Sequence, residues 1–175
     1  MSAPEFSRPV RLDPLGSEPR ALAIEAEAAE RAALAKRFGL VAIERLSAEA
    51  RLVRKGTEIM ASGRIAAAVA QSCVASGEPV EAIVDEPFEL VFRPSPSEIR
   101  PDEEVELNEA ELDIVFYEGG SIDIGEAVAE TMALSLDPFP RAPGADEALK
   151  AAGVKSEEEA GPFGALASLR DKLKR

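Results

Sequence analysis

The stretch EIMASGRIAAAVAQSCVASGEPVEAIVDEPFELVF, residues 58–92, decides the fold. Small apolar residues and polar residues follow each other along Glu58–Cys73, which predicts one long strand. Val80–Phe92 alternates most regularly and predicts a second strand, in which Pro87 indicates a bulge. The connection between the two strands is too short for a crossover, so we expect them to pair in an antiparallel sheet.

Upstream of this stretch, the sequence predicts a long helix over Ser17–Phe38. Ser17 is a suitable N-cap, the body is rich in Ala, Glu and Leu, and Gly39 is a typical left-handed stop. Apolar alternation predicts three further strands, at Phe6–Leu12, Leu40–Leu46 and Ala48–Lys55.

Downstream, Pro94–Asn108 is acidic and proline-rich, which is typical of a loop. A strand is expected at Leu112–Tyr117, and a second helix at Ile124–Leu136 with Ser121 or Asp123 as its cap. The predicted fold class is therefore α+β. It comprises an antiparallel sheet or partly open barrel with a long N-terminal helix, a second helix after the sheet and a short C-terminal helix. We expect one domain over residues 1–145, followed at 146–175 by an acidic linker and that amphipathic helix.

The composition excludes several classes of chemistry. The 175 residues include no His and a single Cys, Cys73, so catalysis by Ser-His-Asp or Cys-His groups is impossible. One thiol cannot build a zinc site, and no cofactor or metal is expected. We therefore expect a protein that is not an enzyme. A carboxylate nuclease would need Asp102, Glu103 and Glu104 to converge, and they lie in a proline-flanked loop.

The chain has neither a bilayer-spanning apolar run nor an apolar N-terminal leader, so a cytoplasmic location is expected. Its formal net charge is −13, and that charge is unevenly distributed. Residues 1–80 carry a net +1, residues 81–160 a net −17 and residues 161–175 a net +3. The acidic stretch is either a solvated face or a docking surface for a basic partner. The candidate contacts in it are Asp102, Glu103, Glu104 and Glu106.

Two further sets of residues are candidates for contact with a partner. The first could bind RNA phosphate, or could form salt bridges with the acidic half. It consists of Arg51, Arg54, Lys55 and Arg64. The second is an apolar stripe near the C-terminus with a basic neighbour, either docked on the body or free to bind a partner. It consists of Phe163, Leu166, Leu169 and Arg170.

Three segments resemble a known family in their order and spacing. The first is VAQSCVASGEPV, residues 69–80, running into DEPFELVF, residues 85–92. The second runs from IDIGEAVAE at 122–130 through LSLDPFPR at 134–141, and the third is GPFGALASLR at 161–170. Together they resemble the YceD family of large ribosomal RNA subunit accumulation proteins, over roughly residues 5–175.

The resemblance implies a role in making or maturing large-subunit ribosomal RNA, with no catalytic residues attached to the fold. Many relatives have a second Cys three residues after the position of Cys73, and some have more after the helix, which suggests a metal site. Here that position is Ser76, and Pro138–Gly144 contains no Cys. The metal site of those relatives is therefore not expected in this chain, and the turn after Cys73 must be stable without a metal.

Two functions remain open from the sequence. One is a non-catalytic ribosome biogenesis factor that binds precursor ribosomal RNA or a large-subunit ribosomal protein, supporting accumulation of 23S ribosomal RNA. The other is an acidic adaptor or chaperone for a basic protein, with only an indirect effect on RNA. Neither a membrane nor DNA is an expected partner, and the sequence leaves the oligomeric state open.

Overall fold

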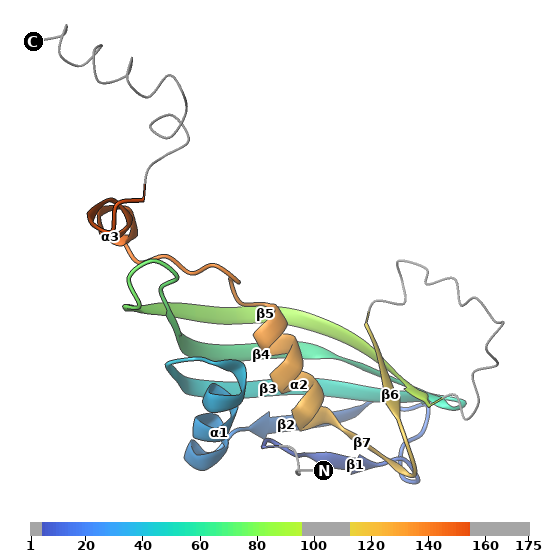
Figure 1. Ribbon diagram of the computed structural model, residues 1–175. Helices are drawn as coiled ribbons and strands as arrows, with labels where there is room; N and C mark the ends of the chain where they lie inside the picture. The colour runs from blue at the N-terminus through green and yellow to red at the C-terminus, as the bar shows by residue number, and fades with distance from the viewer. Residues whose placement is uncertain (1–4, 96–112, 155–175) are drawn as a thin grey trace, which may run out of the picture. The chain divides into compact units, whose positions relative to one another are not determined.

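The computed structural model describes residues 5–95 and 113–154, and this part of the chain is mostly β structure (Figure 1). In it, five strands form a sheet in the order β2-β3-β4-β5-β6, and β1 pairs with β7 separately. The strands are β1 (Pro9–Arg11), β2 (Arg20–Glu25), β3 (Ala42–Lys55), β4 (Glu58–Ser72), β5 (Pro79–Pro94), β6 (Ile114–Tyr117) and β7 (Ser121–Asp123). The helices are α1 (Ala28–Phe38), α2 (Ile124–Leu134) and α3 (Ala145–Ala151). None of these helices has the length and apolar character needed to span a bilayer.

The two long strands predicted within residues 58–92 are confirmed as β4 and β5. The strands expected at Leu40–Leu46 and Ala48–Lys55 are in fact one strand, β3, with a register irregularity between Ile43 and Arg45. β3 pairs antiparallel with both β2 and β4.

The expected fold class, with its long N-terminal helix, is wrong. Arg20–Glu25 is strand β2, paired with Ser47–Leu52 of β3, and the first helix is the short α1 that follows it. Its N-cap is Glu27, which forms a capping box with Glu30, rather than Ser17. The residues of β2 are good helix formers, but the sheet gains a strand whose Ile24 is buried. This tertiary pairing outweighs local propensity.

The expectation of a purely antiparallel sheet is also wrong, because β6 runs parallel to β5. Parallel neighbours need a long connection, and the chain between Pro94 and Ile114 has the length for one. No local pattern in a four-residue strand indicates its direction, since the direction depends on the strand it joins.

One face of the five-stranded sheet carries the core. Alternate strand side chains such as Leu52, Ile65 and Phe92 are buried there with Leu34 of α1 and Met132 of α2. Both helices lie on this side of the sheet in Figure 1. The opposite face of β2, β3 and β4 is exposed or partly exposed within the described residues.

Asp123 fixes the start of α2, which confirms it as one of the two caps expected there. Its Oδ1 accepts hydrogen bonds from the backbone N–H groups of Gly125 and Glu126, both at 3.1 Å. The same carboxylate accepts from the Arg8 backbone N–H at 2.8 Å and from the Ser7 hydroxyl at 2.5 Å. One side chain therefore caps the helix and binds the N-terminal segment to it.

The chain forms two compact units. Of the described residues, the sheet unit comprises 5–71, 81–95 and 113–137, and the cysteine unit comprises 72–80 and 138–154. Both helices that cover the sheet belong to the first unit, whereas α3 and Cys73 belong to the second. The surfaces considered below each lie within one unit.

Candidate functional site

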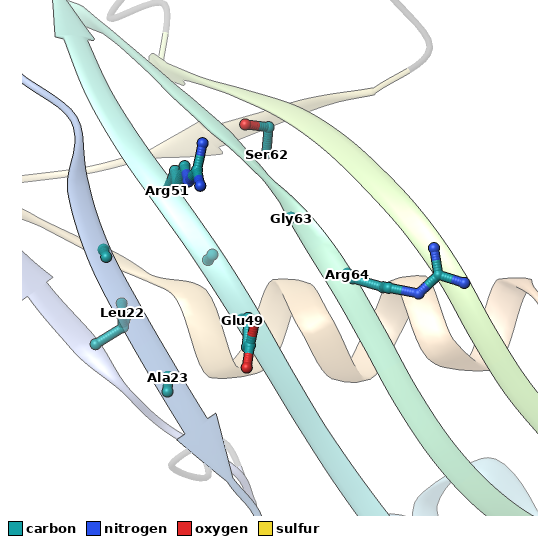
Figure 2. A pocket seen from close by; sticks show the side chains of 9 residues that line it. Leu22, Ala23, Glu49, Arg51, Ser62, Gly63 and Arg64 are labelled. Carbon is teal, nitrogen blue, oxygen red and sulfur yellow. The ribbon is translucent and has the colours of Figure 1, made fainter.

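The exposed face of the sheet unit contains an open hollow of about 530 Å³ (Figure 2). A second hollow of about 490 Å³ shares Ala23, Glu49 and Arg64 with it. We call the first of them the sheet hollow. Five of its nine lining residues are Ala, Ser or Gly, and the full lining is Ala21, Leu22, Ala23, Glu49, Ala50, Arg51, Ser62, Gly63 and Arg64.

The sheet hollow brings together two of the four residues predicted to contact phosphate, Arg51 and Arg64. Figure 2 shows their side chains on the neighbouring strands β3 and β4, with the Arg64 guanidinium directed towards β5. Arg54 is occupied elsewhere, because it donates to the backbone carbonyls of Gly56 at 2.9 Å and Leu12 at 3.1 Å. Lys55 is exposed at the end of β3, outside the hollow.

The charges in the sheet hollow are balanced. Arg64 Nε donates to Asp85 Oδ1 at 2.5 Å, and this hydrogen bond lowers the pKa of the Asp85 carboxyl. Glu49 and Arg51 both line the hollow from β3. Phosphate binding depends on clustered cations. The Glu49 carboxylate and the pairing of Arg64 with Asp85 therefore make the sheet hollow a poor RNA site.

A second surface in the sheet unit lies between α2 and the strands β5 and β6. It is a groove of about 390 Å³, which we call the α2 groove. Buried Phe88 and Leu90 contribute to it, together with Leu134, whose side chain is 86% exposed. The full lining is Pro87, Phe88, Glu89, Leu90, Asp113, Ile114, Val115, Ala127, Glu130, Thr131, Leu134 and Ser135.

The α2 groove combines apolar side chains with charge of one sign. Glu89, Asp113 and Glu130 are its charged residues, all are exposed, and no Lys or Arg is among its lining. Glu130 lies 3.5 Å from Arg37, which is bound more closely by Glu126 at 2.6 Å. Glu89 and Asp113 form no side-chain ion pair with any described residue. This arrangement suits a partner that is both apolar and positively charged.

Two sets of predicted contact residues lie outside the described part of the chain. They are the acidic residues Asp102, Glu103, Glu104 and Glu106, and the C-terminal set Phe163, Leu166, Leu169 and Arg170. The three carboxylates considered for a nuclease belong to the first of these sets. All of these remain predictions.

The cysteine unit is built around the Cys73 sulfur. Cys73 Sγ accepts hydrogen bonds from the backbone N–H groups of Ala142 at 3.3 Å and Ser76 at 3.4 Å. The Ser76 hydroxyl donates instead to Glu78 Oε2 at 3.2 Å. Within the described residues, Cys73 belongs to no group of three or more Cys, Asp or Glu side chains that could hold a metal ion, and position 76 is Ser, so these residues do not fit the metal site that the resemblance implies for some relatives. The turn is held by hydrogen bonds.

These hydrogen bonds predict an acidic thiol. The N–H of Ala142 first, and then Ser76, lower the pKa of Cys73 from its ordinary value of about 9 to about 6. Absorbance at 240 nm should therefore reveal thiolate formation with a midpoint near pH 6, and the C73S variant should show no such step. The unfolded chain binds the thiol proton up to higher pH, so the free energy of unfolding should rise between about pH 6 and pH 9. A midpoint above 8 would contradict the geometry.

Comparison with known proteins identifies the family. A family model described as large ribosomal RNA subunit accumulation protein YceD matches residues 61–170. The chain belongs to the YceD family. No curated protein matches the chain. No solved structure matches it either.

The YceD match distinguishes the two surfaces. Every residue that lines the α2 groove lies between 87 and 135, within the matched residues. The sheet hollow takes Ala21, Leu22, Ala23, Glu49, Ala50 and Arg51 from outside them. The groove is therefore built entirely from residues that the family model matches. Sequence reasoning missed it because its residues come from three separated segments. The one available signal was the charge of residues 81–160.

Proposed function

We propose that this YceD protein is a non-catalytic factor that supports accumulation of large ribosomal RNA by binding a basic protein of the large subunit. The observation that carries the proposal is the α2 groove, which exposed carboxylates and apolar side chains line together without a basic residue. Proteins that bind ribosomal RNA need clustered Lys and Arg to contact phosphate. An acidic groove has the charge to bind such a basic protein before its Lys and Arg side chains contact RNA.

The charge of the chain favours a protein partner over RNA. A net −13 repels a polyanion at long range, and the exposed cations of the sheet hollow are offset by Glu49 and Asp85. The absence of His and the single Cys leave little for acid-base or nucleophilic chemistry. Binding is therefore the function that these residues support best.

Neutralising the groove should weaken this binding. In the double variant E89Q/D113N, we expect affinity for a basic large-subunit protein to fall by about fivefold to tenfold at low salt, because two exposed carboxylates are lost. The loss should shrink at 0.5 M salt, where exposed charges are screened. The binding is measured by titration of purified large-subunit proteins.

The matched control is E18Q/E44Q, which makes the same change in net charge at exposed positions away from the groove. It should bind as the wild type does. If both variants weakened binding equally, the effect would come from the net charge of the protein and not from the groove. If large-subunit proteins captured from cells were released by nuclease, direct RNA contact would replace the proposed function.

A further inference from the structure

Strand β6 has a free edge within the described residues. The order of the sheet places it last, with β5 as its one neighbour. The backbone N–H of Val91 donates to the Asp113 carbonyl at 3.0 Å, and that of Ser95 donates to the Tyr117 carbonyl at 2.8 Å. Backbone groups alternate in direction along a strand. Ile114 and Phe116 therefore direct their N–H and C=O groups away from β5.

This edge is held in place and is apolar. Val115 and Tyr117 pack against the core, and the Tyr117 hydroxyl donates to the Thr57 carbonyl at 2.7 Å. Ile114 and Phe116 alternate with them and lie on the other side, where Phe116 is 58% exposed. The four residues of β6, IVFY, include none of the Lys or Pro residues that protect many edge strands.

The charges beside this edge are acidic. Asp113 and Glu118 flank β6 in sequence, and Glu89 on β5 lines the adjoining α2 groove. All three are exposed, and no side-chain ion pair links them to a described residue. A segment that docked here would meet negative charge along its length.

We infer that β6 accepts an extended basic segment of the partner protein as an additional strand. The segment would hydrogen-bond to the outward groups of Ile114 and Phe116 and place apolar side chains beside theirs. Its Lys or Arg side chains would lie near Asp113 and Glu118. The inference rests on the proposed function and specifies how the basic partner binds, since strand addition takes affinity from main-chain hydrogen bonds and specificity from alternate side chains.

A nine-residue peptide of alternating Lys and Val, blocked at both ends, is the probe. Bound to the full-length protein labelled with ¹⁵N, it should slow hydrogen exchange of the Ile114 and Phe116 amides by more than about tenfold, because both become hydrogen-bonded. A peptide with every amide N-methylated keeps its charge and should bind at least about tenfold more weakly, since it has no N–H donor on either edge. An alternating Glu and Val peptide should not bind.

The variants F116P and F116A separate the backbone contact from the side chain. Proline at position 116 removes the outward N–H and leaves the hydrogen bonds to β5 in place. Edge strands tolerate proline where the N–H points away from the sheet. F116P should therefore weaken binding more than F116A, while F116A still shows protection at residue 114. If F116P does not fold, the exchange experiment on the wild type decides by itself.

The possible outcomes separate this inference from the proposed function. Tight binding of the Lys-Val peptide with unprotected Ile114 and Phe116 amides would overturn strand addition and leave the groove as a basic-protein site. Equal binding of the N-methylated peptide would overturn it as well. If the peptide does not bind but a purified basic large-subunit protein does, strand addition at β6 is rejected and the proposed function stands. Failure of both would reject the proposed function.

Discussion

Replacing Gly63 by Ala should destabilise the protein by on the order of 3 kcal/mol, because a methyl group has no room there. Gly63 of β4 lies opposite Ala50 of β3, and a Cβ built on it collides with the Glu49 carbonyl oxygen and lies 2.9 Å from the Ala50 Cα. These are backbone atoms, which cannot turn aside as a flexible side chain does. Relief would require the two central strands of the sheet to separate.

Urea unfolding followed by circular dichroism measures this loss. The matched control is G120A, because Gly120 has open space around its Cβ position and no positive φ. The control should stay within about 0.5 kcal/mol of the wild type, as exposed substitutions usually do. Equal midpoints for G63A and G120A would show that β3 and β4 do not approach as closely as described.

Replacing Asp123 by Ala should cost a similar amount, on the order of 3 kcal/mol, since it removes a helix cap and leaves several donors without their acceptor. The affected donors are the N–H groups of Arg8, Gly125 and Glu126, together with the Ser7 hydroxyl. The substitution should loosen both the N-terminal segment and the start of α2, because the carboxylate joins the two.

The variant D123N is the matched comparison, since its amide oxygen can still accept from the helix N–H groups. We expect D123N to lose about half as much stability in urea as D123A, and S7A to lose least of the three. Limited proteolysis should cut D123A near its N-terminus before the wild type. A D123A midpoint equal to that of S7A would contradict the capping role.

Local patterns predicted the strands better than the first helix. Val80–Phe92 alternates between large apolar and polar residues, and most of it lies within β5. Arg20–Glu25 carries Ala at two outward positions, so its alternation is faint and its helix propensity high. Only the pairing with β3 reveals it as a strand. The parallel direction of β6 likewise depends on a neighbour distant in sequence.

The candidate site was predictable only in part. Arg51 and Arg64 could be placed together because they lie on strands that are consecutive in sequence. The engagement of Arg54 with the Leu12 carbonyl could not be foreseen, since it depends on how the N-terminal segment approaches β3. The pairing of Arg64 with Asp85 corresponds to the salt bridging to the acidic half that the sequence left open.

The docking of a basic large-subunit protein in the α2 groove is tested most directly by site-specific photocrosslinking in cells. A photoreactive residue at Leu134, which is 86% exposed in the groove, reports what lies there, and one at Ala23 in the sheet hollow is the comparison. We predict that the Leu134 probe crosslinks to a basic large-subunit protein, that nuclease does not remove the product, and that the Ala23 probe gives far less of it. Crosslinks from Leu134 to ribosomal RNA without protein would contradict this function.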